Sequence, residues 1–144
     1  MANTAFETLK DDFEFIDDWE ERYKYVIELG KNMQALPDDE KSEQNKVHGC
    51  VSQVWIKSQF PPDENGTKRL TFLGDSDAMI VRGLVAILQI LLNNQPLSDV
   101  ISIDAANELA SLGLNDHLTP QRSNGLSSMI KRLQSDALIE VSKT

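Results

Sequence analysis

The stretch Lys46-Val-His-Gly-Cys-Val-Ser-Gln-Val-Trp-Ile-Lys57 lies where a polar loop turns into the first predicted strand, and it carries the only cysteine of the chain. Gly49 precedes that cysteine and tolerates backbone torsions that other residues avoid. The residues after Cys50 are rich in β-branched and aromatic side chains, which favour a strand. We therefore expect Cys50 where a loop enters a strand, with one flank of the sulfur open to a partner.

The segment that follows the cysteine predicts a β-hairpin. Apolar residues partly alternate over Val51–Phe60, as in a half-buried strand. The turn residues of 61–66 end it, with Asn65-Gly66 supplying positive backbone torsions, and Lys68–Leu73 returns as the second strand. A lone hairpin is only marginally stable in water, so a third strand near Lys46 or a packed helix must support it.

Helical patterns lie on both sides of this hairpin. The apolar spacing, the caps and a proline at a first helical position indicate where these helices begin. The expected helices cover Thr4–Ile16, Trp19–Met33 behind the caps Asp17 and Asp18, Ala78–Leu92 behind the caps Asp75, Ser76 and Asp77, Leu97–Ile101, a helix from the cap Asp104 to Gly113, and Thr119–Glu140 with Leu126, Met129, Ile130, Leu133 and Leu138 buried. This order predicts one α+β domain over residues 1–144, with a small antiparallel sheet packed against several helices.

Composition narrows the classes of partner. A net charge of −9 argues against nucleic acid and anionic membrane surfaces, which need clustered basic residues. One cysteine cannot form an internal disulfide, and the first residues lack the pattern of a signal peptide, so we expect a cytoplasmic protein. The apolar run Met79–Leu92 is too short to cross a bilayer. Partners should be proteins or small molecules.

Few chemistries suit a single thiol. A metal or iron–sulfur site needs several converging ligands, and one cysteine with two histidines predicts neither a bound metal nor a cofactor. A mononuclear site from His48, Cys50 and a carboxylate stays an alternative. In extended backbone His48 would point the same way as Cys50 and lower its pKa, but no protease or amidase signature is present. A lone thiolate can still attack a partner's sulfur, and a nearby arginine such as Arg122 would stabilise its charge.

Three blocks of sequence carry a resemblance to the SufE family of sulfur-acceptor proteins, which includes CsdE. They are Gly49-Cys-Val-Ser-Gln-Val-Trp55, Gly74-Asp-Ser-Asp-Ala78 with Ile80-Val-Arg-Gly-Leu84, and Leu118-Thr-Pro-Gln-Arg-Ser-Asn-Gly-Leu126. The similarity extends from the Trp19–Gly30 segment to the last helix. It implies an α+β fold similar to IscU-type scaffolds, in agreement with the order of elements.

The resemblance also implies a function. The chain looks like a partner of a pyridoxal-phosphate cysteine desulfurase of the SufS or CsdA kind, as an accessory protein and not as an enzyme. In such proteins the cysteine matching Cys50 takes a persulfide sulfur and passes it to a SufBCD-type scaffold. Removal of the persulfide also speeds the desulfurase. The cysteine loop shelters the thiol and opens on docking, a motion that Gly49 would suit.

Further residues carry over by position. Asp77 matches a family aspartate near the cysteine loop, and Arg122 matches an arginine of the partner-facing surface. His48 departs from the family pattern. Two other functions stay open: a metal or cluster scaffold of the IscU type, and a non-covalent regulator of the desulfurase. The sequence decides neither between the SufE and CsdE systems nor between a monomer and a homodimer.

Overall fold

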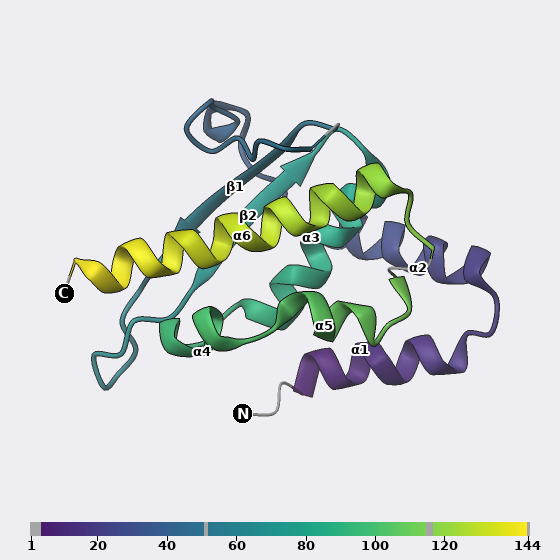
Figure 1. Cartoon of the computed structure of the whole chain (residues 1–144), viewed down its shortest axis with the longest axis horizontal. Helices are drawn as coiled ribbons and strands as arrows, with labels where there is room; N and C mark the ends of the chain where they lie inside the picture. The colour runs from purple at the N-terminus through teal and green to yellow at the C-terminus, as the bar shows by residue number, and fades with distance from the viewer. Residues whose placement is uncertain (1–3, 51, 115–116, 144) are drawn as a thin grey trace.

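The computed structural model describes residues 4–50, 52–114 and 117–143. A hairpin of two strands lies among helices that come from both ends of the chain (Figure 1). In chain order the elements are α1 (Thr4–Phe15), α2 (Trp19–Asn32), the 3₁₀ turn η1 (Asp38–Glu40), β1 (Val54–Gln59), β2 (Thr71–Ser76), α3 (Met79–Leu92), α4 (Leu97–Ser102), α5 (Ala105–Ala110) and α6 (Pro120–Ser142).

The sheet confirms the predicted α+β class. β1 and β2 pair antiparallel, in a register that runs from Val54 opposite Ser76 to Gln59 opposite Thr71. Within the described residues, the third strand expected near Lys46 is reduced to a single bridge between Lys46 and Trp55. Val51, the predicted start of β1, lies outside the described residues.

β2 begins and ends three residues further along the chain than the predicted strand, and it includes Gly74. The predicted strand ends at Leu73, just before Gly74, but Gly74 pairs with Ile56. A Cβ atom on Gly74 would lie only 2.7 Å from Cγ1 of Val85, so the missing side chain lets α3 approach the sheet. In the turn, Gly66 has a φ of +80°, and Asn65 does not share this positive torsion.

α3 forms the centre of the core, as its apolar composition predicts. Ile87 and Leu88 are fully buried, and α1 and α2 cover this helix with buried residues of their own, which are Phe6, Leu9, Phe13 and Val26. Together with the hairpin, these helices bury one continuous apolar cluster.

The predicted caps of α3 are wrong. Its N-cap is Ala78, which makes no side-chain capping bond. The Ser76 hydroxyl accepts a hydrogen bond from the Ala78 amide at 3.2 Å, just before the helix begins. Asp75 is buried instead, with 3% of its surface exposed, and forms ion pairs with Lys41 at 3.6 Å and Arg82 at 3.4 Å. The strand continues to Ser76, so these carboxyl and hydroxyl groups serve the sheet and the adjacent loops.

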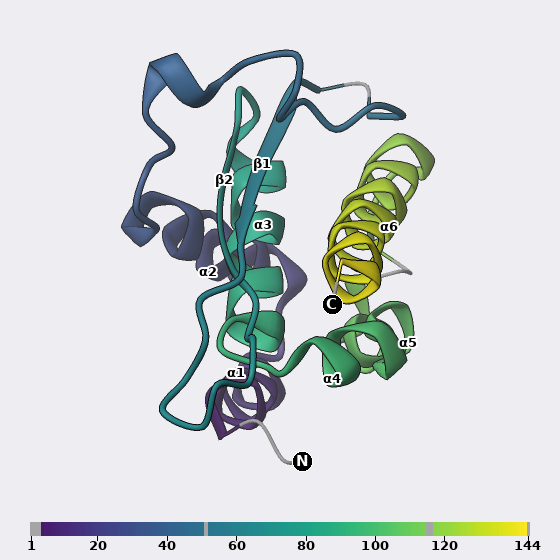
Figure 2. The same ribbon diagram turned by 90° about the vertical axis from the view of Figure 1, so that its left-hand side faces the viewer.

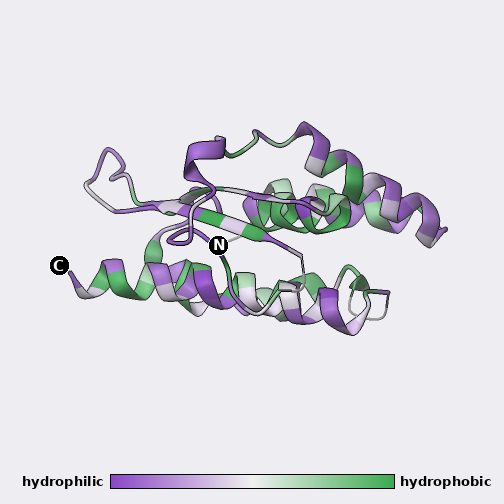
Figure 3. Ribbon diagram, turned by 90° about the horizontal axis from the view of Figure 1, so that it is seen from above, coloured by the Kyte–Doolittle hydropathy of each residue, from purple (hydrophilic) through white to green (hydrophobic). Residues whose placement is uncertain are grey.

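α6 lies beside the hairpin, with its N-terminal end near the loop that precedes β1 (Figure 2). Thr119 caps it, as predicted, by accepting a hydrogen bond from the Arg122 amide at 3.3 Å. Figure 3 shows hydrophobic and hydrophilic residues alternating along this helix, as one buried face requires. The prediction that Leu138 is buried is wrong, since 53% of it is exposed and Ala137 takes the core position.

α5 is shorter than the helix that the sequence predicts. Asp104 caps it, accepting a hydrogen bond from the Asn107 amide at 3.1 Å. The helix ends at Ala110 rather than at Gly113, and Gly113 has a φ of +81° in the turn beyond it. No helix in the described part of the chain is both long and apolar enough to cross a membrane.

Candidate functional site

Cys50 lies against the first turns of α6. Its thiol, which is half-buried, donates a weak hydrogen bond to the carbonyl oxygen of Gly125, with 3.6 Å between Sγ and that oxygen. A Cβ atom on residue 125 would lie 3.4 Å from Sγ, so the glycine makes room for the sulfur. Gly125 is thus a point of close packing in α6, and its packing partner is the cysteine.

A pocket of about 230 Å³ opens beside the thiol. It combines the cysteine loop, the start of α3 and the N-terminal end of α6. The residues that line it are Cys50, Ser52, Val81, Thr119, Gln121, Arg122 and Gly125. The pocket therefore joins two of the predicted site residues, Cys50 and Arg122, that are far apart in the sequence.

The arm of chain that leads into the cysteine is paired with β1. The Val47 amide donates to the Val54 carbonyl and the Ile56 amide donates to the Asn45 carbonyl, each at 2.8 Å. Cys50 thus occupies the tip of a second, shorter hairpin whose outer arm precedes β1. Backbone pairing thus holds the base of this hairpin against β1.

Asp77 holds the other end of the cysteine loop. Its Oδ1 atom accepts a hydrogen bond from the Gln53 amide at 3.1 Å, and its own amide donates to the Gln53 carbonyl at 3.3 Å. Asp77 does not line the pocket with Cys50. Its place is at the exit of the loop, close to β1.

Arg122 is exposed on the first turn of α6 and forms part of the pocket wall. The N-terminal end of a helix carries a partial positive charge, so its peptide dipoles and the guanidinium act in the same sense. A negative charge in the pocket would be attracted by both the guanidinium and the helix end. The Gly125 carbonyl, in contrast, accepts its hydrogen bond from the neutral thiol.

Gly49 and His48 differ in what they contribute. Gly49 has a φ of +93°, and a Cβ atom there would lie 2.6 Å from Oγ of Ser128 on α6. This left-handed torsion interrupts the extended backbone on which the expected parallel orientation of His48 and Cys50 depended. The His48 side chain is 75% exposed, and its Nε2 atom lies 3.9 Å from Oε2 of Glu43, a contact that is an ion pair only when the imidazole is protonated.

Burial raises the pKa of the Cys50 thiol above its ordinary value. The cause is desolvation, which penalises the thiolate more than the neutral thiol. The sheltered sulfur is therefore a weaker nucleophile at neutral pH than an exposed cysteine. Moving the loop tip outward would remove this penalty.

The sequence did not indicate two residues that build the surroundings of the thiol, Gly125 in this role and Arg132. Arg132 binds backbone carbonyls of the arm that precedes Cys50. The available signal was spacing, because residues 125 and 132 are two helical turns apart and therefore share one face of α6.

Among the described residues, no group of three or more His, Cys, Asp or Glu side chains is arranged to hold a metal ion.

The sequence of this chain is similar to one protein family and to curated proteins that are named after it. A family model described as "SufE: Fe-S metabolism associated domain" matches residues 7–137. An uncharacterized SufE-like protein of Rhizobium meliloti (strain 1021) is 47% identical over 93% of this chain and 95% of its own length. A second one, from Rhizobium etli, is 44% identical over 94% of this chain and 90% of its own length.

A solved structure shares the fold. The solution structure of a hypothetical protein from Thermus thermophilus superposes with a TM-score of 0.73 and covers 99% of both chains, at 21% sequence identity.

Proposed function

Because the chain belongs to the SufE family, an accessory family of iron–sulfur metabolism, we propose that Cys50 accepts a persulfide sulfur from a cysteine desulfurase and passes it to a cluster-assembly scaffold. Family membership supports the coarser role, sulfur transfer in iron–sulfur metabolism beside a cysteine desulfurase. The role of Cys50 as acceptor, the stimulation of the desulfurase and a SufBCD-type scaffold as receiver are the finer parts of the proposal.

The transfer step needs no external oxidant or reductant. Cys50 loses its proton, and the thiolate attacks the outer sulfur of the desulfurase persulfide. A new sulfur–sulfur bond forms on Cys50 while the bond to the desulfurase cysteine breaks, and that cysteine leaves as a thiolate with the electron pair. The proton released by Cys50 restores the thiol of the leaving cysteine. Removing the persulfide frees the desulfurase for its next turnover.

The observation that carries this proposal is the pocket beside the thiol. A water molecule occupies about 30 Å³ in the liquid, so a pocket of about 230 Å³ has room for one additional sulfur on Cys50. Arg122 and the N-terminal end of α6 favour the negative charge that a persulfide carries near neutral pH. The same pocket shields the bound sulfur from thiols in solution.

Docking to the desulfurase would move the Cys50 thiol from its sheltered position to one where it can attack the persulfide. The buried thiol is weakly acidic, so transfer requires that Cys50 leave the pocket and meet the desulfurase persulfide in a more polar setting. Gly49 offers a backbone hinge beside the cysteine, and the paired arm at Val47 keeps the base of the loop in place. The loop tip thus alternates between the partner and the pocket.

The test is a mass measurement after incubation with a SufS- or CsdA-like desulfurase, pyridoxal phosphate and cysteine, without reductant. We expect the Cys50 peptide to gain the mass of one sulfur atom, and a thiol reductant to remove it. The Cys50→Ser variant is the matched control and should gain nothing. An active desulfurase of each kind that leaves Cys50 unmodified would contradict the proposal. Stimulation that survives in Cys50→Ser would favour a non-covalent regulator.

A further inference from the structure

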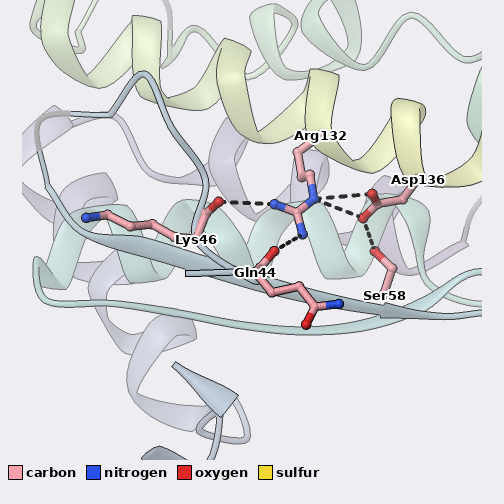
Figure 4. A network of polar contacts seen from close by, with 5 residues as sticks. All are labelled: Gln44, Lys46, Ser58, Arg132 and Asp136. Atoms are coloured by element: carbon pink, nitrogen blue, oxygen red, sulfur yellow. Dashed lines mark hydrogen bonds and ion pairs between the residues drawn. The ribbon is translucent and has the colours of Figure 1, made fainter. Parts of the chain in front are cut away.

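Arg132 of α6 binds the arm of chain that leads into Cys50, at residues 44 and 46 (Figure 4). Its Nη1 atom donates to the Lys46 carbonyl at 3.1 Å, and its Nη2 atom donates to the Gln44 carbonyl at 3.0 Å. These two carbonyls lie on one side of the arm, and the planar fork of the guanidinium matches them both. A single side chain thus ties the arm to the helix.

A second set of contacts fixes the direction of this guanidinium. Nε of Arg132 donates to both carboxylate oxygens of Asp136, each at 3.2 Å, one helical turn further along α6. Asp136 in turn accepts a hydrogen bond from the Ser58 hydroxyl of β1 at 2.8 Å. The Arg132 and Asp136 side chains are largely buried, 25% and 20% exposed. The network therefore connects the arm, α6 and β1 through side-chain hydrogen bonds.

The same face of α6 holds the thiol. Gly125, which receives the Cys50 thiol, and Ser128, which lies against Gly49, are two turns and one turn before Arg132 on the helix. α6 therefore contacts the cysteine loop at two levels, at its arm through Arg132 and at its tip through Gly125.

We propose that Arg132 is a positioning residue for sulfur transfer, which holds the arm of the cysteine loop on α6 so that only the loop tip moves when Cys50 leaves its pocket. The inference rests on the function proposed above for Cys50. Arg132 does not line the pocket, so it acts on the thiol through the backbone of Gln44 and Lys46. Without Arg132, the arm would be held in place by its backbone pairing with β1.

The first measurement is alkylation of Cys50 by iodoacetamide in the full chain, which needs no partner protein. In Arg132→Met, which keeps much of the apolar stem, we expect alkylation to be about tenfold faster and its pH midpoint to be lower, because local opening exposes the thiol. Arg132→Lys keeps the charge but cannot bridge the carbonyls and the carboxylate at once. It should give an intermediate rate.

The second measurement is transfer with a cysteine desulfurase. Arg132→Met should lower the maximal rate of sulfur transfer about fivefold, while the concentration of the protein at half-maximal rate stays unchanged, because a misplaced thiol impairs transfer and not docking. A defect confined to half-maximal concentration, or no defect in either quantity, would overturn the inference.

The matched control is Lys68→Met. It removes a 2.7 Å ion pair between Lys68, in the connection from β1 to β2, and Glu140 near the end of α6. It should alter neither the alkylation of Cys50 nor its pH midpoint. If Arg132→Met fails to fold, Asp136→Asn tests the same network, since it keeps a partner for Ser58 and weakens the orientation of Arg132. We then expect about threefold faster alkylation.

The outcomes separate this inference from the proposed function. Unchanged alkylation in a folded Arg132→Met variant overturns the positioning role, whatever the desulfurase assay gives. Faster alkylation in that variant, together with a wild-type protein that accepts no sulfur, supports the grip on the loop and contradicts the function of Cys50 as acceptor.

Discussion

Asp77 and Gln53 hold each other through two hydrogen bonds: the Gln53 amide donates to the Asp77 carboxylate at 3.1 Å, and the Asp77 amide donates to the Gln53 carbonyl at 3.3 Å. This reciprocal pair closes the exit of the cysteine loop, opposite the arm held by Arg132. Since α3 is capped at Ala78 without a side-chain bond, Asp77 serves the loop and not the helix.

Asp77→Ala should loosen the loop without unfolding the protein. Loss of the carboxylate removes one of the two bonds, so we expect alkylation of Cys50 to rise about threefold. The free energy of unfolding should change by less than about 0.5 kcal/mol, as for an exposed residue outside the core. Both quantities are measurable on the isolated protein, and a clear loss of stability with unchanged alkylation would show that Asp77 supports the fold instead.

Gly125 separates helix stability from the fit of the thiol. Gly125→Ala should stabilise the protein by about 0.5–1 kcal/mol through helix propensity, because the added Cβ lies at 3.4 Å from Sγ and needs only a small shift. Gly125→Leu should fill the pocket, displace Cys50 and reduce the yield of persulfide strongly. Ser127→Leu adds the same side chain on an exposed face of α6 and should leave the yield unchanged.

Arg122 should act on the charged sulfur and not on the loop. We expect Arg122→Gln to reduce sulfur transfer to Cys50 about tenfold, since the guanidinium no longer stabilises the anion in the pocket. Alkylation by the neutral reagent iodoacetamide should change much less. Lys131→Gln removes an equal charge from an exposed position of the same helix and controls for net charge. An equal effect of both variants on transfer would count against a local role for Arg122.

The pH dependence of alkylation reports the shelter of the thiol. Because burial raises the pKa of Cys50, alkylation in the folded protein should reach its midpoint above the ordinary value of 9.0, and in urea it should return toward that value. The linked stability is complete below the ordinary pKa and is lost as the pH rises toward the folded pKa, since the unfolded chain ionises first. Identical midpoints in both states would mean that the thiol is exposed at rest.

The crossing of α2 and α3 provides a test of the fold. A Cβ atom on Gly83 would lie 2.2 Å from the Val26 carbonyl oxygen, so Gly83→Ala should cost about 2–4 kcal/mol through forced separation of the helices. Gly66→Ala is the comparison: its φ is +80°, but no atom lies within 4 Å of the added Cβ, and the cost should be about 1 kcal/mol. Denaturant unfolding of the two variants measures the difference, and an equal loss would contradict tight helix contact at Gly83.

Local patterns in the sequence predicted much of this fold. Thr119 and Pro120 started α6, Asp104 capped α5, and the apolar run of α3 indicated the centre of the core, because caps and periodicity act over a few residues. The errors came where a distant element decided. Gly74 was expected to end a strand, but it is part of β2 because α3 packs closely there, and Leu138 lost its core position to Ala137.

The candidate site divides in the same way. The sequence by itself determined that one thiol follows a glycine in the loop that leads into a strand, and its motifs identified the family, because both depend on short stretches of sequence. Only the tertiary structure decided that the thiol rests on Gly125 and that Arg132 holds its loop, contacts that join residues 75 or more positions apart. Periodicity indicates which face of α6 is turned inward, but the partners of that face depend on how the helix and the hairpin pack together.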